Sequence, residues 1–249
     1  MTDLKAFLDE KYLKYNNTSF IETDPIQIPR QFSEKENIEI AGFLAATIAW
    51  GQRKTIINNS LKLMRWMDNN PIDFLLNASE NDYKPFLDFK HRTFNGEDCV
   101  FFIKSLRNIY LNHGGLEEIF SHGSSVREGL INARKVFFSI EHPTTSNRQF
   151  SNVEKKSAAK RLNMYLRWMV RKDNNGVDFG IWNKISPSQL YLPLDVHTAN
   201  VSRQLGLLTR KQNDWQAVEE LTGKLREFDP NDPVKYDFAL FGLGAFENF

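Results

Sequence analysis

Apolar residues recur at helical spacing along most of the chain, and this periodicity constrains the fold more than any other feature of the sequence. One example is the stripe formed by Ile56, Ile57, Leu61, Met64 and Met67. Alternating apolar and polar runs, which half-buried strands require, are missing, and there is no internal repeat. With 13 Gly and 9 Pro in 249 residues, the chain also has few of the turn residues that a many-stranded sandwich or barrel needs. The sequence therefore predicts an all-α protein.

The bounds of the helices follow from this periodicity and from capping signals. Ser33 followed by Glu36 has the spacing of a capping box, which predicts a helix from Ser33 to Trp50, ended by Gly51. A second helix is expected after Gly51, and others are expected over residues 71–76, 99–111, 116–120, 126–140, 154–171, 195–206, 215–228 and 233–246. We expect a single two-lobed unit, with one lobe mainly at 33–140 and the other mainly at 153–249 together with the N-terminal helix.

The single cysteine, Cys99, excludes an internal disulfide framework and a four-cysteine zinc or iron–sulfur site. Charges are spread through residues 1–15, unlike a signal peptide, and no run of eighteen apolar residues exists. We therefore expect a soluble cytoplasmic protein with no membrane partner.

The charge of the chain is balanced globally but not locally. The net charge is +1, whereas residues 148–226 contain 14 basic and 7 acidic residues and so carry +7. A basic segment on a neutral protein is a candidate surface for the phosphates of nucleic acid. The alternative is an ordinary solvated face of a helix, and charge alone favours that alternative.

Asp195 follows Pro193 and Leu194 and opens a predicted helix. An aspartate at this position is a favoured N-cap, because its carboxylate accepts hydrogen bonds from free backbone N–H groups. The same position also directs a carboxylate outward, where it can balance a developing positive charge or position a water molecule. The spacing alone does not choose between the two roles.

These residues carry a resemblance to a known superfamily. The segment Leu192–Gly206, with Asp195, His197, Arg203 and a closing Leu-Gly, resembles the V-D-T-H-V…R…R-L-G stretch of the helix-hairpin-helix DNA glycosylases. Residues 43–52 and 95–110 resemble the buried helix, the following loop and the next amphipathic helix of the same superfamily. Residues 160–171 resemble a run found in a poorly characterised bacterial family of conserved proteins.

The resemblance implies a glycosylase-like helical fold with a degenerate hairpin, and residues 153–160 take the place of the Leu-Pro-Gly-Val-Gly hairpin. It implies that Lys160 is the Schiff-base lysine and that Asp195 is the catalytic carboxylate. The spacing of the two is nearest to that of the archaeal oxoguanine glycosylases. Double-stranded DNA with a damaged base is then the partner.

Several residues are expected at the DNA. In this reading Gln52 fills the space left by a flipped base, although a Gln that only caps a helix is the alternative. Lys155, Lys156 and Ser157 replace the glycine N–H groups of the hairpin with side-chain contacts to phosphate. The full set of expected DNA-binding residues is Gln52, Arg53, Lys54, Lys155, Lys156, Ser157, Arg161 and His197.

Other interpretations stay open. Lys160 is equally well explained as a solvated lysine. For the whole protein, the alternatives are a DNA-binding module that keeps the fold without catalysis and a helical protein with no nucleic-acid role. A metal site is not expected, because the Asp195-x-His197 pair lacks a recognisable third and fourth ligand. No cofactor is expected.

Overall fold

The computed structural model describes residues 2–247 and 249, with the backbone alone for Thr2 and Phe20. Within these residues the chain is all-helical, and the only pairings of strand type are two isolated bridges, His91 with Phe94 and Ser157 with Asp214. The predicted all-α class is confirmed.

No helix in the described part of the chain combines the length and the apolar character that a membrane span requires.

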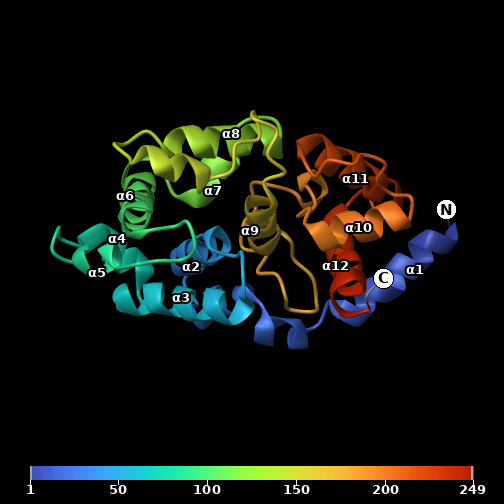
Figure 1. Ribbon diagram of the computed structural model, residues 1–249, viewed down its shortest axis with the longest axis horizontal. Coiled ribbons are helices and arrows are strands. Elements are labelled where there is room, and N and C mark those ends of the chain that lie inside the picture. Colours follow the sequence, from blue (N-terminus) through green and yellow to red (C-terminus); the bar gives the residue numbers. More distant parts are fainter. Residues whose placement is uncertain (1, 248) are drawn as a thin grey trace. The chain divides into compact units, whose positions relative to one another are not determined.

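The chain folds into two compact units, one continuous and one built from both ends of the sequence. Unit 2 comprises Thr23–Ser151. Unit 1 comprises Met1–Glu22 and Asn152–Phe249, of which Met1 and Asn248 lie outside the described residues. Figure 1 follows these segments by colour, from blue at the N-terminus to red at the C-terminus.

Unit 2 is a set of helices around an aromatic core. Its elements are η2 (Pro25–Gln27), η3 (Pro29–Gln31), α2 (Lys35–Thr47), α3 (Arg53–Trp66), α4 (Pro71–Asn77), α5 (Lys84–Leu87), α6 (Gly96–Asn112), α7 (Leu116–Phe120), α8 (Val126–Phe137) and η4 (Thr144–Arg148). Helix α2 is apolar almost all round and is therefore buried along most of its length. Its Phe43 ring lies 5.7 Å from Phe137 and 6.3 Å from Phe102, which places α2, α6 and α8 around one core.

Helix α6 begins with a capping box that the sequence analysis did not identify. The Asn95 side chain accepts a hydrogen bond from the Asp98 amide at 2.9 Å, and Asp98 accepts one from the Asn95 amide at 3.2 Å. Asp98 is fully buried, and it also accepts hydrogen bonds from Ser146 Oγ at 2.6 Å and Gln149 Nε2 at 3.3 Å. One carboxylate thus caps α6 and ties the segment after α8 to it.

Unit 1 contains the first helix of the chain and the whole C-terminal part. Its elements are α1 (Thr2–Tyr15), α9 (Lys160–Val170), η5 (Pro187–Gln189), α10 (Val196–Gln204), α11 (Trp215–Phe228), η6 (Pro233–Lys235) and α12 (Tyr236–Phe246), and η1 (Thr18–Thr23) runs to its boundary with unit 2. Helices α1 and α12 lie side by side, as blue and red ribbons in Figure 1. Gly242 permits this approach, because a Cβ there would lie 2.2 Å from Cδ2 of the Tyr15 ring.

A buried network of charged residues stabilises the centre of unit 1. Arg171 pairs with Asp178 at 3.1 Å and with Asp232 at 2.8 Å, while Arg167 pairs with Asp178 at 3.3 Å and also with Asp237. Burial alone would lower the pKa of Arg171, but the Asp178 and Asp232 carboxylates outweigh it and raise that pKa. Buried charges persist when they are paired in this way, whereas removing one partner leaves an uncompensated charge.

The structure corrects three predictions about the helices. Ser33 does not cap α2, because the helix begins two residues later and Glu34 occupies the cap position in an extended conformation. The helix predicted over 154–171 begins only at Lys160, because Lys156 (φ 66°) and Ala159 (φ 48°) adopt left-handed conformations that a right-handed helix cannot include. The third correction concerns the basic segment 148–226, because Arg167 and Arg171 on and after α9 are buried in the network above and add nothing to a basic surface.

Candidate functional site

Asp195 lies immediately before the first turn of α10 and caps it. The buried residues Pro193 and Leu194 lead the chain to this point, where Asp195 adopts an extended conformation with φ −109°. Its Oδ1 accepts a hydrogen bond from the Thr198 amide at 2.8 Å. The prediction that Asp195 is an N-cap is confirmed, and its second oxygen, Oδ2, is directed to another partner.

That partner is Lys160, the first residue of α9. Its Nζ lies 3.5 Å from Asp195 Oδ2, so the structure brings together the amine and the acid that lie 35 residues apart in the sequence. The Lys160 side chain is 37% exposed and that of Asp195 15%, which leaves the amine within reach of a ligand from solvent. Asp195 thus has two functions in the free protein: one oxygen holds α10, and the other balances the charge of Lys160.

A buried carboxylate on α12 lies within electrostatic range of this pair. Asp237 accepts a hydrogen bond from Arg167 Nη1, and Arg167 lies two turns after Lys160 on α9. Burial raises the pKa of Asp237 to about 6; Arg167 and Lys160 act to lower this pKa, and Asp195 acts to raise it further. The charges that act on Asp237 therefore come from α9, through Lys160 and Arg167, and from the N-cap of α10, Asp195.

Helix α12 is held against α10 by close packing. A Cβ at Gly244 would lie 3.0 Å from His197 Cβ and 3.1 Å from Val201 Cγ2, which leaves room for glycine and little else. His197 itself is exposed on the first turn of α10, beside Asp195.

The loop that replaces the predicted hairpin uses its own backbone donors. The Asn152 side chain accepts hydrogen bonds from the amides of Glu154 (2.9 Å) and Lys155 (3.2 Å), and the Asn152 carbonyl accepts one from Ser157 at 3.1 Å. The Lys156 amide donates to the Val153 carbonyl at 3.0 Å. A glycine-rich hairpin would offer such N–H groups to a phosphate, whereas these are occupied within the protein.

The side chains of this loop are more accessible than its backbone. Lys155 and Lys156 are exposed, and neither has an ion-pair or hydrogen-bond partner for its ammonium group among the described residues. Ser157 Oγ accepts a hydrogen bond from the Ala159 amide at 3.2 Å and so helps to position the start of α9. Arg161 is only partly exposed, and burial lowers its pKa to about 10.

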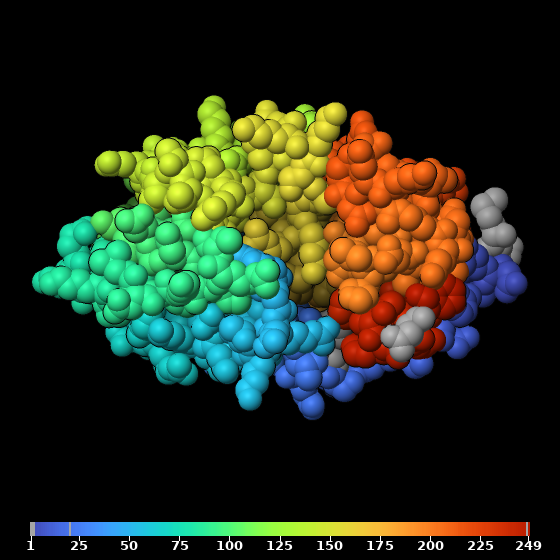
Figure 2. All heavy atoms as spheres, in the orientation of Figure 1, coloured from blue at the N-terminus to red at the C-terminus, as the bar shows by residue number. Residues whose placement is uncertain are grey.

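The loop is fastened to the start of α11. The Trp215 amide donates to the Lys156 carbonyl at 3.0 Å, and Ser157 forms an isolated bridge with Asp214. In the space-filling view, yellow residues from this loop region meet the orange-red surface around residues 210–220 (Figure 2).

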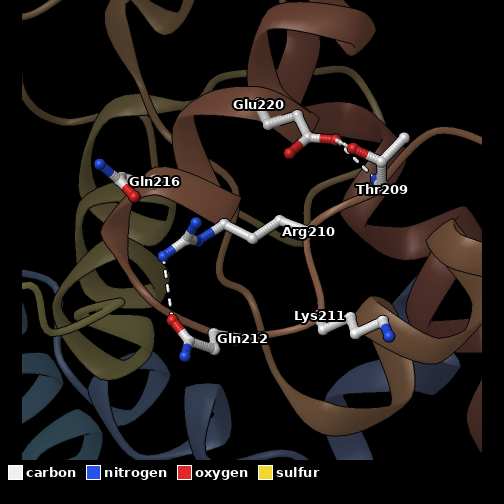
Figure 3. Close-up of a pocket in the computed structure, with 6 residues that line it drawn as sticks. All are labelled: Thr209, Arg210, Lys211, Gln212, Gln216 and Glu220. Carbon is white, nitrogen blue, oxygen red and sulfur yellow. Dashed lines mark hydrogen bonds between the residues drawn. The ribbon is translucent and has the colours of Figure 1, made fainter.

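Next to this junction is an open, polar pocket of about 480 Å³. Glu220 accepts hydrogen bonds from the Thr209 amide (2.6 Å) and hydroxyl (2.7 Å), and Arg210 pairs with Asp214 at 2.5 Å. Figure 3 shows the Glu220–Thr209 pair and Arg210 directed to Gln212, with Lys211 extending away from them. Four of the six lining side chains thus pair with one another, whereas Lys211 and Gln216 have no side-chain partner among the described residues.

Gln52, the predicted wedge, lies on an exposed turn of unit 2. It occupies the N-cap position of α3, but its side chain makes no capping hydrogen bond. Gly51 allows the turn, because its φ is +104°. His91 Nε2 donates a hydrogen bond to the Trp50 carbonyl at 2.9 Å and so holds the backbone just before Gly51. The side chain of Gln52 is therefore presented to solvent from a constrained loop.

The two basic residues after Gln52 differ in their environments. Arg53 donates to Thr23 Oγ1 at 3.2 Å and is partly exposed, whereas Lys54 is exposed. Both lie in the first turn of α3 in unit 2, and Lys160 and Asp195 belong to unit 1.

The described residues contain no group of three or more His, Cys, Asp or Glu side chains arranged to hold a metal ion. His197 follows Asp195 by two residues, but a third ligand for the two is not found in this part of the chain.

Sequence reasoning missed Asp237 and the role of Arg167. The Asp237 segment reads as an ordinary apolar helix, and nothing local marks its carboxylate as a neighbour of Asp195. A usable signal was present in Arg167, because an arginine within the apolar run Leu162–Val170 needs a buried acid as partner.

Comparison with known proteins places the chain in a family. The sequence pattern of the family described as protein of unknown function (DUF2400) matches residues 24–246. The chain belongs to this family. The match to DUF2400 includes Gln52, Lys160, Asp195 and Asp237, and begins after α1. No match was found among curated proteins or among solved structures.

Proposed function

We propose that the protein is a DNA base-excision glycosylase, acting on a damaged base such as oxoguanine, with AP-lyase activity through a Schiff base on Lys160. The observation that supports this is the 3.5 Å separation of Lys160 Nζ and Asp195 Oδ2 at the starts of two helices. This is the pair that the resemblance to the helix-hairpin-helix glycosylases implies. Their fold, with residues 153–160 as the degenerate hairpin, is part of the proposal.

In the proposed reaction, a base in duplex DNA is first rotated out of the stack, since its sugar is otherwise inaccessible. Lys160 gives up one proton, and its lone pair forms a bond to the sugar C1′. The bond between C1′ and the base breaks, and the base leaves with the bonding electrons and takes up a proton. The Asp195 carboxylate stabilises the positive charge that develops on the sugar.

The lyase step follows from the same nitrogen. It loses a proton, its electrons form the C1′=N double bond, and the C1′–O4′ bond breaks as O4′ takes up a proton. Loss of a C2′ proton then breaks the C3′–O bond, and the phosphate leaves with the bonding electrons. Borohydride supplies a hydride to the C1′=N carbon and makes the enzyme–DNA link permanent.

The accessible side chains supply the proposed DNA contacts. Lys155 and Lys156 bind backbone phosphates through their ammonium groups, since the loop amides have internal partners. Gln52 acts as the wedge from its exposed turn. The location that goes with this proposed activity is the cytoplasm, where the protein would meet DNA.

The proposal is tested by trapping with borohydride on duplexes that carry oxoguanine, uracil, an alkylated base or an abasic site. We expect a covalent adduct on at least one duplex, and none with Lys160→Ala. Asp195→Asn keeps an N-cap, because Asn is as good a cap as Asp, but base release falls by about a hundredfold or more.

Lys224→Ala is the matched control, because Lys224 is an exposed lysine on α11 that pairs only with Glu227 among the described residues. It should give the wild-type yield of adduct. Absence of both adduct and base release on every duplex, or an unchanged yield in Lys160→Ala, would overturn the proposal.

A second candidate is a DNA-binding protein without catalysis. It is favoured by the missing glycine-rich hairpin, since the backbone amides of residues 154–157 are bonded within the protein. Salt-dependent binding to duplex DNA without turnover, and unaltered by Asp195→Asn, would support this candidate over the enzyme.

A further inference from the structure

Arg92, in the loop before α6, has a left-handed backbone although it carries a long side chain. Its φ is +55°, a value that glycine or asparagine adopts more readily than arginine. Such a conformation persists only where the surrounding structure imposes it, and residues held in this way cluster at ligand-binding sites. The contacts that hold Arg92 therefore bear on its role.

On one side, the loop is fixed to the turn that carries Gln52. The buried His91 ring donates a hydrogen bond from Nε2 to the Trp50 carbonyl at 2.9 Å, and its Nδ1 lies 2.9 Å from Asn59 Nδ2. The Trp50 ring lies edge-on to the His91 ring, with 5.1 Å between the two centroids. The residue before Arg92 is thus held against both the Gln52 turn and α3.

The backbone that follows Arg92 is fixed as well. His91 and Phe94 exchange two backbone hydrogen bonds, of 2.8 Å and 2.9 Å. Between them, the Thr93 carbonyl accepts a hydrogen bond from Gln149 Nε2 at 2.8 Å. The strained conformation of Arg92 is therefore imposed by its neighbours, and its side chain takes no part in holding it.

The Arg92 side chain lies over Gly51. A Cβ at Gly51 would lie 3.3 Å from both Cδ and Nη1 of Arg92. Arg92 is exposed, and its guanidinium has no hydrogen-bond or ion-pair partner among the described residues. Gln52, directly after Gly51, is exposed too. A guanidinium with unused donors thus lies at the turn that presents Gln52.

This arrangement suits an anion that accepts two hydrogen bonds from a guanidinium, as a phosphate does. Lys54 and Lys90 lie two residues from Gln52 and Arg92 in the sequence, and both are exposed without a partner for their ammonium groups in the described chain. Several cations near one turn favour a ligand with repeated negative charge, such as the backbone of duplex DNA. Because the Arg92 backbone is already fixed, binding costs less conformational entropy than it would from a mobile loop.

We propose that Arg92 binds a backbone phosphate of duplex DNA beside the Gln52 turn and so fixes the position of that turn on the duplex. The proposal rests on the DNA partner of the proposed function, but not on its chemistry. Phosphate contacts carry no sequence information, so Arg92 contributes to affinity and to register on the duplex, and not to the choice of lesion.

The proposal is tested by titrating the full-length protein with two undamaged duplexes of different sequence over a range of salt concentrations. Arg92→Ala should weaken binding to both about tenfold at about 0.1 M salt. It should also reduce the slope of log K against log salt by about one, because one phosphate contact is lost. Arg92→Lys should keep the slope, because the charge remains, but it should bind about threefold more weakly because lysine lacks the guanidinium fork.

Arg92→Gly separates binding from stability. It should bind as weakly as Arg92→Ala, whereas its urea midpoint should be higher than that of the wild type, because glycine adopts this φ without strain. A lower urea midpoint together with wild-type binding would assign Arg92 a purely structural role and overturn the proposal. Should Arg92→Ala not fold, Arg92→Gly still decides the DNA contact.

Arg65→Ala is the matched control. Arg65 is an exposed arginine of the same unit, without a described partner for its guanidinium, and its backbone is helical. It lies in the last turn of α3, about 20 Å from Gln52 at 1.5 Å per residue. Affinity and slope should be unchanged in Arg65→Ala. Equal values in Arg92→Ala and Arg65→Ala would overturn the proposal, as would a loss confined to one duplex sequence, which would place Arg92 against a base edge.

Failure of this contact is distinguishable from failure of the proposed function. If the wild type binds duplex with the expected dependence on Arg92 but forms no borohydride adduct, the enzymatic function fails and the Arg92 contact stands. If the wild type forms adduct and Arg92→Ala binds duplex as the wild type does, the Arg92 contact fails and the function stands. If the wild type binds no duplex even at low salt, the Arg92 contact is overturned.

Discussion

Lys156 and Ala159 are the residues at which local conformation matters most for the candidate site. Both lie in the left-handed region, which costs a residue with a side chain about 1–2 kcal/mol relative to glycine. The hairpin of the resembled superfamily places glycines in its loop, and this chain has lysine, serine and alanine there instead. Lys156 thus presents its ammonium group to solvent from a backbone conformation that is unfavourable for lysine.

Replacing Lys156 with glycine should separate stability from binding. We expect Lys156→Gly to raise the free energy of unfolding by about 0.5 kcal/mol, because relief of left-handed strain exceeds the added entropy of the unfolded chain. Binding to duplex DNA should weaken in the same variant, with a smaller salt dependence, because one phosphate contact is lost.

The measurements are urea unfolding and DNA titration at two salt concentrations. Lys155→Gly is the control, since Lys155 is not among the residues with positive φ in the described chain. That variant should lose stability as well as binding. A loss of stability in Lys156→Gly comparable to that of Lys155→Gly would contradict the expectation.

At this scale the sequence predicts what is local. The cap formed by Asp195 was predictable, because capping depends on one side chain and an amide three residues later. The left-handed conformation of Lys156 was not predictable, because lysine rarely adopts it and its presence in a sequence does not indicate it. Asp237 was not predictable either, since its neighbours Arg167 and Asp195 are 70 and 42 residues away in the sequence.

At the scale of helices, the contact between α1 and α12 shows how the ends of the chain are joined. Glu247, directly after α12, accepts hydrogen bonds from Lys11 (2.9 Å), Lys14 (2.7 Å) and the Tyr15 hydroxyl (2.5 Å). These bonds lower the pKa of Glu247 to about 2. Small residues such as Gly242 then let the two helices approach, so that charge and packing act together.

Glu247→Gln should therefore destabilise the protein in a pH-dependent manner. Since the pKa of Glu247 is lower in the folded than in the unfolded state, its contribution is fully present above pH 4.5 and is lost as the pH falls toward 2. We expect the thermal midpoint at pH 7 to fall by about 1–3 °C, a modest amount because the group is near the surface.

The check is thermal unfolding of the wild type and Glu247→Gln at pH 7 and pH 3. The difference between them should be smaller at pH 3. Equal differences at both values would show that the ionised carboxylate is not the source of the stability.

Helix positions were largely predictable, because each amphipathic helix repeats its own pattern. The predicted bounds of α7 and α11 coincide with those observed, at Leu116–Phe120 and Trp215–Phe228. The start of α9 was predicted about six residues too early. Residues 154–159 have a helical composition, but they form a turn that hydrogen bonds to the Asn152 side chain stabilise.

At the scale of the whole molecule, the division into units separates a continuous stretch from a discontinuous one. Unit 2 is formed by Thr23–Ser151 alone, with Phe43, Phe102 and Phe137 packed at its centre. Unit 1 needs α1 as well as residues 152–249. The all-α class was predictable from periodicity, but which helices share a unit depends on contacts between distant residues.

Residues 23–151 should fold as a separate fragment. We expect helical circular dichroism, an aromatic near-ultraviolet signal and one cooperative thermal transition, because this aromatic core is built from the fragment's own residues. A fragment of residues 152–249 is the comparison, and it should unfold less cooperatively because it lacks α1.

Adding a peptide of residues 1–22 to the second fragment should restore part of its stability. A non-cooperative transition for residues 23–151, or equal cooperativity of the 152–249 fragment with and without the peptide, would contradict this division.

The discontinuity of unit 1 has a consequence for biosynthesis. Helix α1 is translated well before its packing partner α12, because the whole of unit 2 lies between them in the sequence. Unit 2 is therefore free to fold before α12 can pack on α1, and the Lys160–Asp195 pair gains the support of α12 only after residues 236–246 have been made. A prematurely terminated product would carry a folded centre with the candidate reactive site missing or unfinished.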